Sequence, residues 1–412
     1  MNKGNSKAMT HRLKYVISGV LILLFAGLIY AWSVLSSPIA SEFSDFSNGE
    51  ISLTFTMAMS FFCLGGLIAG LLAGKIKEKL IFIFSALLFL AGFVLVSFMQ
   101  SIGALYLGFG ILAGLGAGFS YNTVMGSVTR WFPDKKGLIS GILLMGFGIG
   151  AFIIGKIYTA FLPSVGWRKE FRFLGIIVFF VILLCGFLIR KPEPSEEANL
   201  KTGEKEQENT ESHDFTTKEM VSKFSFWFYF IWTVLLSAAA LALIAQAGGI
   251  VKEVSKHLSA GTIATVVGLI SVFNGVGRVM FGGIYDRLGQ KKTMLLNNVL
   301  YLTSVLITMA GLNGRSLSLI VLGFVFFGLS YGGVTPTNSA FIMDFFGQKN
   351  YPVNFSIINL NLLFASFGGT LAGMIYDKKG SYMSIFVIMI IAIALSTVSA
   401  LLIRRPKAAE NK

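Results

Sequence analysis

Charged residues are scarce in this chain of 412 residues. Asp, Glu, Lys and Arg make up 13% of it and hydrophobic residues 54%, whereas about 25% of the residues of soluble domains are charged. This balance excludes a large soluble domain and indicates a polytopic, all-α membrane protein. The two cysteines, Cys63 and Cys185, both lie in apolar segments, so we expect neither a disulfide nor a metal site.

The few histidines and acidic residues also limit the chemistry. All three histidines lie outside the apolar segments, and no cluster of His, Asp and Glu residues is visible in the sequence. A membrane-embedded enzyme is therefore not expected. No Gly-rich Lys-Ser/Thr loop follows a strand, so we expect no cofactor, no nucleotide and no active pumping.

Long apolar runs dominate what is present. A segment of about 20 apolar residues can cross the bilayer as a helix. We predict twelve such spans, at 15–38, 50–74, 79–99, 102–129, 138–163, 171–190, 224–248, 262–285, 293–311, 316–343, 354–376 and 382–403. The first of them follows a short basic segment without a cleavage site, so we expect a retained span rather than a signal peptide.

One long hydrophilic segment divides these spans into two sets of six. It covers 191–223 and is rich in Glu, Lys, Thr and Ser, a composition typical of a solvated linker. We predict an N-terminal six-helix bundle at 1–190 and a C-terminal six-helix bundle at 224–412. The end of the linker, Thr216 to Lys223, is predicted to form a short surface helix.

The net charge of +14 reflects topology rather than nucleic-acid binding. Of the 34 Lys and Arg residues, 24 lie in the N-terminus, in the loops that follow even-numbered spans, and in the C-terminus. Eight lie in the loops that follow odd-numbered spans, on the opposite side of the membrane. The positive-inside rule then places both termini and the linker in the cytoplasm. The expected location is the cell's inner, cytoplasmic membrane, and the expected state is a monomer.

The two halves repeat one another. Gly118-Phe119-Ser120-Tyr121 in span four corresponds to Gly328-Leu329-Ser330-Tyr331 in span ten, and Gly283–Gly289 is echoed by Met374–Gly380. Such repeats are typical of transporters built from related bundles with a site near the membrane midplane.

Arg278 is a fixed positive charge inside span eight. It lies in Thr262–Tyr285, which has no other charge, about 6 Å from the midplane at helical rise. An arginine stays protonated in proteins, and a charge there costs about 2.5–3.5 kcal/mol by insertion scales. Every acidic residue falls in a predicted loop or at a helix end, so the simplest counter-ion is an anionic substrate. The alternative is an arginine satisfied by carbonyls or directed toward Asp286.

Four motifs carry a family resemblance. The loop Gly282–Lys292, with Asp286 and Arg287, resembles the signature loop of the major facilitator superfamily, and an acid with adjacent basic residues there can form a cytoplasmic latch. The equivalent loop after span two has Gly74 where the acid is expected. Gly27–Val34, Arg130–Leu138 and Lys218–Met220 resemble the oxalate/formate antiporter family, which is similar to the monocarboxylate transporters of lactate and pyruvate.

The resemblance implies a twelve-helix major facilitator fold and a small organic anion as substrate. Oxalate transporters of this family carry a lysine in span eleven, whereas Asn354–Phe364 here contains no basic residue. One fixed cation matches one carboxylate, so a monocarboxylate such as lactate, pyruvate or formate is favoured. An oxalate/formate antiporter is the alternative, and an anion channel fits less well because channels favour rings of charge along a pore.

Several further residues are candidates for the site. Asn274 lies one helical turn from Arg278 and either contacts the substrate or braces the arginine. Tyr30, Tyr121 and Tyr331 fall in spans that line the central cavity of the superfamily, although tyrosine also occurs in interfacial belts. In span eleven, Asn359, Asn361 and Phe364 are positioned to close the site or simply to pack.

The sequence leaves two roles open for Lys156 and two modes open for energy coupling. Lys156 in span five either extends to the outer interface or acts as a second cation of the site. The chain is expected to work as a proton symporter or as an anion exchanger, because no carboxylate or histidine is evident in the membrane path. Peripheral candidates for a proton site are Asp286, Asp377, Glu253 and His257.

Overall fold

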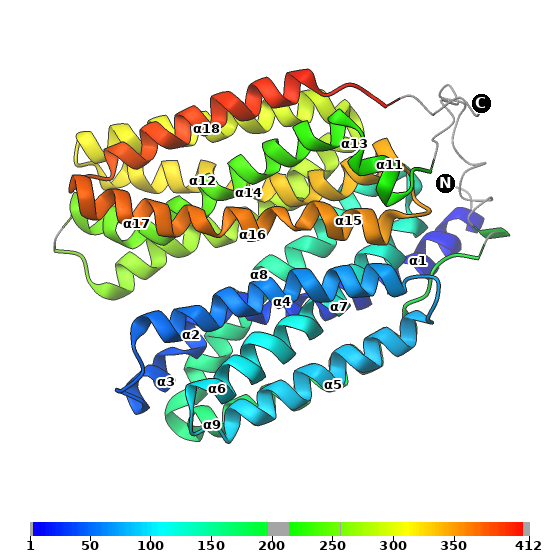
Figure 1. Cartoon of the computed structure of the whole chain (residues 1–412), viewed down its shortest axis with the longest axis horizontal. Coiled ribbons are helices and arrows are strands. Elements are labelled where there is room, and N and C mark those ends of the chain that lie inside the picture. Colours follow the sequence, from blue (N-terminus) through cyan, green and yellow to red (C-terminus); the bar gives the residue numbers. More distant parts are fainter. Residues whose placement is uncertain (1–2, 194, 197–213, 256, 407–412) are drawn as a thin grey trace. The chain divides into compact units, whose positions relative to one another are not determined.

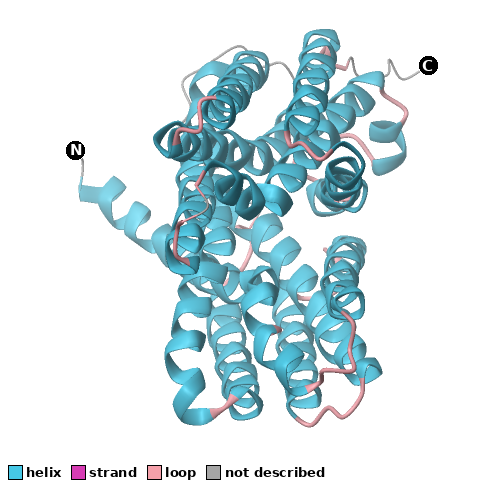
Figure 2. Ribbon diagram, turned by 90° about the vertical axis from the view of Figure 1, so that its left-hand side faces the viewer, coloured by secondary structure: helices cyan, strands magenta, loops and turns pink. Residues whose placement is uncertain are grey.

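The computed structural model describes residues 3–193, 195–196, 214–255 and 257–406. Within these ranges the regular elements are helices, and one isolated bridge joins Ala73 and Ile76. Figures 1 and 2 show the helices and the short loops between them. Most of the predicted linker, residues 194 and 197–213, lies outside the described residues.

The elements follow the predicted spans closely. The first half contains α1 (Lys3–Ala26), η1 (Gly27–Ala31), α2 (Trp32–Leu35), α3 (Ser37–Glu42), α4 (Asn48–Leu72), α5 (Glu78–Ser97), α6 (Ile102–Leu105), η2 (Tyr106–Ala113), α7 (Gly114–Val128), η3 (Thr129–Trp131), η4 (Pro133–Lys135), α8 (Lys136–Val165) and α9 (Trp167–Leu188). The second half contains α11 (Thr217–Val221), α12 (Phe224–Val254), α13 (Ala260–Asn313), α14 (Leu317–Phe346), α15 (Tyr351–Asn359), α16 (Asn361–Ala365), α17 (Phe367–Lys379) and α18 (Met383–Leu402).

Eleven helical stretches in the described part are long and apolar enough to cross a membrane. Twelve spans were predicted, and the difference arises in α13, where the eighth and ninth segments form one long helix. This helix bends at Gly289, whose φ of +74° is a left-handed value that glycine adopts without strain. Both predicted segments are therefore helical, and the bend separates them.

The chain divides into two compact units, and each takes most of its residues from one half of the sequence. Unit 1 comprises 1–134, 142–209 and 351–357, and unit 2 comprises 135–141, 210–350 and 358–412. The helix α8 thus contributes its first turns to unit 2 and the rest of its length to unit 1. Similarly, α15 belongs mainly to unit 1, although it follows α14 of unit 2 along the chain.

Close helix packing in unit 1 depends on small residues. A Cβ atom on Gly118 of α7 would collide with the backbone of Phe62 in α4, and one on Gly65 of α4 would collide with the backbone of Leu115 in α7. Glycines let the two backbones approach each other, as is common in membrane helices.

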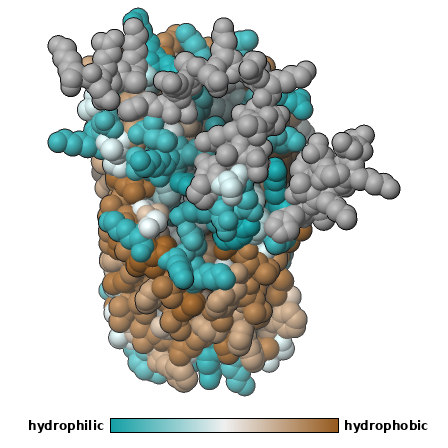
Figure 3. All heavy atoms as spheres, turned by 90° about the vertical axis from the view of Figure 1, so that its right-hand side faces the viewer, coloured by the Kyte–Doolittle hydropathy of each residue, from teal (hydrophilic) through white to brown (hydrophobic). Residues whose placement is uncertain are grey.

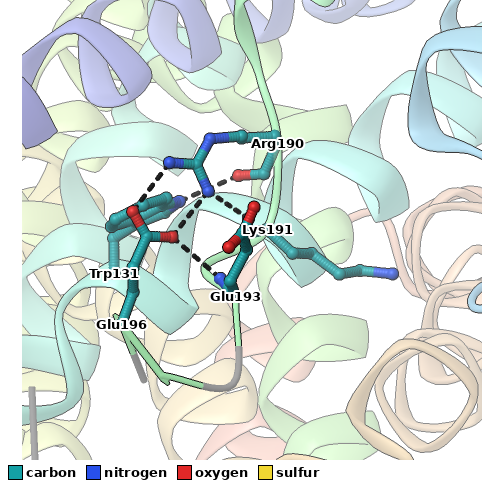
Figure 4. A network of polar contacts seen from close by, with 5 residues as sticks. All are labelled: Trp131, Arg190, Lys191, Glu193 and Glu196. Atoms are coloured by element: carbon teal, nitrogen blue, oxygen red, sulfur yellow. Dashed lines mark hydrogen bonds and ion pairs between the residues drawn. The ribbon is translucent and has the colours of Figure 1, made fainter. Parts of the chain in front are cut away.

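A polar network holds the first residues of the linker in unit 1 (Figure 4). The Arg190 guanidinium makes two bonds of 2.6 and 2.8 Å to the Glu196 carboxylate and lies 4.8 Å from the Trp131 ring. The Trp131 indole donates to the Arg190 carbonyl at 2.8 Å, and Lys191 pairs with Glu78 at 2.5 Å. Trp131 belongs to the family-like Arg130–Leu138 motif, so the motif has an architectural role here.

The outer surface of the helices is apolar, as a lipid environment requires. In α9 the side chains of Phe173, Phe180 and Leu184 are more than half exposed, and Figure 3 shows broad hydrophobic areas on the face that it presents. Polar residues would be expected at these positions in a soluble helix.

The short surface helix predicted before span seven is present as α11, with a capping box between Thr216 and Glu219.

Candidate functional site

Arg278 lies in the interior of unit 2, on α13. Its side chain is only 8% exposed, and its Nε donates a hydrogen bond of 2.9 Å to Oδ1 of Asn274, one turn earlier on the same helix. The spacing of four residues places both side chains on one face of the helix. The bond fixes the orientation of the guanidinium, whose paired Nη groups have the geometry that matches a carboxylate.

Glycines allow the neighbouring helices to pack closely around Arg278. A Cβ atom on Gly332 of α14 would collide with the backbone of Asn274 and approach the backbone nitrogen of Arg278, and one on Gly277 would collide with the Leu329 carbonyl. On the other side, a Cβ atom on Gly141 of α8 would collide with the Arg278 carbonyl. Three helices therefore meet at backbone contact, which leaves little freedom for the arginine's position.

Tyr331 of α14 is brought close to this arginine. It is half-buried and lies within electrostatic reach of Arg278. Its ring packs 6.5 Å from that of Phe327. Arg278, Asn274 and Tyr331 thus form one polar group in unit 2, which we call the Arg278 site.

The other two candidate tyrosines belong to unit 1, where they share an aromatic cluster. The rings of Tyr30 and Tyr121 lie 5.4 and 5.1 Å from the Phe147 ring, both edge-on. Tyr121 is 3% exposed and also stacks on Phe355 at 5.8 Å. These ring contacts fix the positions of the Tyr30 and Tyr121 side chains.

Span eleven is interrupted twice, at Leu360 and at Ser366. Asn359, at the end of α15, is buried at 6% exposure. The buried Asn361 donates to the Ile358 carbonyl at 2.7 Å, while its Oδ1 has no hydrogen-bond partner among the described residues. Phe364 is 57% exposed and packs edge-on against Phe230 of α12 at 5.9 Å.

Lys156 lies on the exposed face of α8. Its ammonium is 5.9 Å from the centre of the Phe152 ring, one turn earlier on the helix. This position is compatible with both predicted roles, an extension to the interface and a second cation.

The signature loop after span eight holds the start of α8 within unit 2. The Asp286 carboxylate accepts the backbone N–H groups of Gly137 and Leu138 at 2.7 and 2.8 Å. These donors lie in the first turn of a helix, where N–H groups lack partners inside the helix and favour a negative charge. Arg287 is exposed, and in the corresponding loop after span two Gly74 has a φ of +81°.

Asn122, which follows Tyr121 in the repeated motif, was not predicted as a site residue. It is 1% exposed, and its amide nitrogen donates to the carbonyls of Gly66 and Pro352 at 2.7 and 2.9 Å. A polar residue in the middle of an apolar span was the available signal. Glu170 was expected in a loop or at a helix end, and it does lie in the first turn of α9, but its burial at 5% exposure was not predicted.

Comparisons with known proteins agree with this architecture. A model of the Major Facilitator Superfamily matches residues 17–366 and, in a second match, 254–412. Two solved structures of that superfamily share the fold. They are the proton:xylose symporter XylE, with a TM-score of 0.70 at 12% identity over 95% of this chain and 97% of that one, and FucP, with a TM-score of 0.65 at 15% identity over 95% and 100%.

Two curated proteins with similar sequences are named as transporters of organic acids. The oxalate:formate antiporter of Oxalobacter formigenes is 28% identical over 94% of this chain and 91% of its own length. Monocarboxylate transporter 2 of Rattus norvegicus is 22% identical over 83% of this chain and 72% of its own length.

Proposed function

Since this chain belongs to the Major Facilitator Superfamily, we propose that it moves a small monocarboxylate anion across the cytoplasmic membrane by alternating access. The chain is a multi-pass membrane transporter, and two of its relatives are named as transporters of organic anions. Lactate, pyruvate and formate are the substrates we propose, with the carboxylate held by Arg278. We propose no catalytic role.

The observation that carries this proposal is the burial of one permanent cation. Among the described Lys and Arg side chains, Arg278 is the one that is buried. A guanidinium inside a protein favours an anionic ligand, and we propose that the translocated anion binds it during the transport cycle. The bond to Asn274 supports this assignment because it orients the guanidinium for two parallel hydrogen bonds to a carboxylate.

Exchange of oxalate for formate is the second candidate, favoured by the 28% identity to the oxalate:formate antiporter. A dicarboxylate calls for a second cation, and span eleven offers asparagines instead. The other basic residue well inside a predicted span is Lys156, which is exposed on α8. We therefore place monocarboxylates first and assign Lys156 to the interface.

The sequence supports the remaining parts of the proposal. The distribution of Lys and Arg residues favours cytoplasmic termini, the superfamily favours a monomer, and the anion travels either with a proton or in exchange for another anion. In this scheme the Asp286 contact to α8 stabilises one conformation of the carrier and is released in the other.

Counterflow in proteoliposomes tests the substrate class. Vesicles preloaded with unlabelled lactate, formate or oxalate are given the same labelled anion outside, and the transient accumulation is measured. We expect accumulation for the monocarboxylates and little for oxalate. Strong counterflow with oxalate alone would favour the exchanger, and none with any carboxylate would refute the proposal.

A further inference from the structure

Glu170 is a buried acid in unit 1 that the Arg278 site does not use. Its side chain is 5% exposed, and its Oε2 has no hydrogen-bond partner among the described residues. Among the described charged side chains, Glu170 and Arg278 are the two that are buried. Ionisable residues within membrane spans are costly and default to a functional role.

The surroundings of Glu170 are aromatic. Its neighbour Phe171 packs edge-on against Trp167 at 5.8 Å and against Tyr158 of α8 at 6.2 Å. Tyr158 is 2% exposed and interacts electrostatically with Glu170, yet its hydroxyl also lacks a hydrogen-bond partner in the described part of the chain. A carboxylate here would be desolvated and unpaired, and the neutral carboxylic acid avoids that cost.

The basic residues near Glu170 are engaged elsewhere. Arg168 donates to Glu42 of α3 at 2.6 Å and to the Met99 carbonyl at 3.0 Å. Hydrogen bonds from Arg168 and then Trp167 hold the pKa of Glu42 below its usual value, so Glu42 stays ionised and neutralises Arg168. Arg172 lies over the Phe98 ring at 5.0 Å.

Among the described side chains, the other elements packed against α9 bring no counter-ion to this end. Lys169 of α9 and Lys156 of α8 are exposed. The charged residues of α5 lie at its opposite end, at Glu78 and Lys79, and those of α1 lie in its first half. Glu170 therefore differs from the other acids of this region by having no cation to hold it in the ionised form.

The helix α8 joins the Glu170 region to the Arg278 site. Its residues 136–141 belong to unit 2, where Gly141 packs on the Arg278 backbone and Asp286 binds the first turn. From residue 142 onward α8 belongs to unit 1 and carries Tyr158. One helix thus carries residues of both units, and the proposal below requires α8 to shift when the carrier changes conformation.

We propose that Glu170 binds the proton that accompanies the anion in net transport. In the conformation described, the carboxylic acid keeps its proton. When α8 shifts against α9 and water enters, the O–H bond breaks, the proton passes to water and the carboxylate remains until it is protonated again. One proton and one monocarboxylate together carry no charge, so net transport is electroneutral. This inference rests on the proposed function.

Infrared difference spectroscopy on the reconstituted full chain tests the proton site directly. We expect the carbonyl stretch of a protonated carboxylic acid near neutral pH in the wild type, its loss at high pH, and its absence from Glu170→Gln. Glu50→Gln is the control, because Glu50 is an exposed acid of a capping box and its change leaves the band in place. A wild type without the band, or a band that persists in Glu170→Gln, would overturn the site.

Transport then tests the coupling. In Glu170→Gln, we expect lactate uptake driven by a pH gradient to be lost and lactate exchange at equal pH to continue, because the amide mimics the protonated acid. Uptake driven equally well in both proteins would overturn the coupling. A wild type that moves no carboxylate under any condition would instead refute the proposed function, while the infrared result would still decide whether Glu170 holds a proton.

Discussion

At the scale of single residues, the pair of Arg278 and Asn274 allows the charge of the site to be changed without changing its shape. Asn274→Asp places a carboxylate where the amide oxygen already accepts from Nε at 2.9 Å. This carboxylate becomes a permanent counter-ion and competes with the substrate. We expect a folded protein that has lost anion uptake.

Uptake and thermal unfolding in detergent, measured on the same preparations, check this prediction. Asn313→Asp, an exposed asparagine at the end of the same helix, is the matched control and should transport normally. Normal uptake by Asn274→Asp would show that the substrate does not need the Arg278 charge.

Tyr331 supplies a second test at this scale. Tyr331→Phe removes one hydroxyl near Arg278 and keeps the ring that packs on Phe327. Losing a hydrogen bond to a charged group costs about 1.5–3 kcal/mol, so the apparent affinity should fall about tenfold or more. Tyr121→Phe is predicted to have the same effect if its phenol reaches the anion. Competition assays measure both, and unchanged affinities would leave the tyrosines with packing roles.

The sequence predicted the residues of the Arg278 site better than it predicted isolated polar residues. The spacing of four residues put Asn274 and Arg278 on one helix face, and a bond between them was one of the two roles left open for Asn274. Asn122 and Glu170 were missed because their importance depends on which helix faces them, and helix neighbours cannot be read from periodicity. Glu170 was expected in a loop or at a helix end, which is where it lies, but its burial in the first turn of α9 was not predicted.

At the scale of elements, glycine contacts fix the geometry of α13 against α14. Gly277→Ala introduces a Cβ atom that collides with the Leu329 carbonyl, whereas Gly268 on the same helix has no other atom within 4 Å of such a Cβ. Overpacking of this kind costs about 1–3 kcal/mol. We expect Gly277→Ala to lower the unfolding temperature and uptake together.

Gly268→Ala is the control, since it adds the same methyl group to the same helix in open space. Thermal unfolding in detergent and uptake in vesicles are measured for both variants. Equal effects of the two changes would mean that the contact between α13 and α14 is not as close as described.

The sequence located the helices but not their interruptions. The α13 bend coincides with Gly289 in the signature loop, which was predicted as a loop between two spans. The breaks in span eleven at Leu360 and Ser366 were not predicted, because neither glycine nor proline marks them. Their cause lies partly in Asn361 and Ser366, whose side chains donate to the backbone carbonyls of Ile358 and Leu363, and such bonds compete with regular helix formation.

At the scale of the whole molecule, the Asp286 contact is expected to control the rate of the transport cycle. Asp286→Ala leaves two N–H groups of the α8 first turn without their acceptor, and the loss of a helix cap costs about 1 kcal/mol. We expect the maximal rate of uptake to fall about fivefold with little change in apparent affinity, because the Arg278 site is intact.

Initial rates over a range of lactate concentrations separate the two effects. Asp377→Ala is the matched control, because Asp377 occupies the repeated position at the end of α17 and is exposed. A change in affinity without a change in maximal rate would contradict a latch.

The fold of the whole molecule was predictable because twelve apolar segments, one linker and internal repeats each point to the same architecture. The sharing of α8 and α15 between the two units was not, since it depends on contacts between residues far apart in the sequence. The loop motif marked Asp286 as important, yet its partners at Gly137 and Leu138 are backbone groups, which carry no sequence signal.

The most direct test of the central claim is the uptake of labelled lactate and formate by proteoliposomes containing the wild type, Arg278→Lys, Arg278→Ala or Arg404→Ala at matched protein content. Arg404 is an exposed arginine after the last helix. We predict normal uptake in Arg404→Ala, strongly reduced uptake in Arg278→Lys, which keeps the charge without the paired donors, and none above protein-free vesicles in Arg278→Ala. Wild-type uptake by Arg278→Ala would contradict the account.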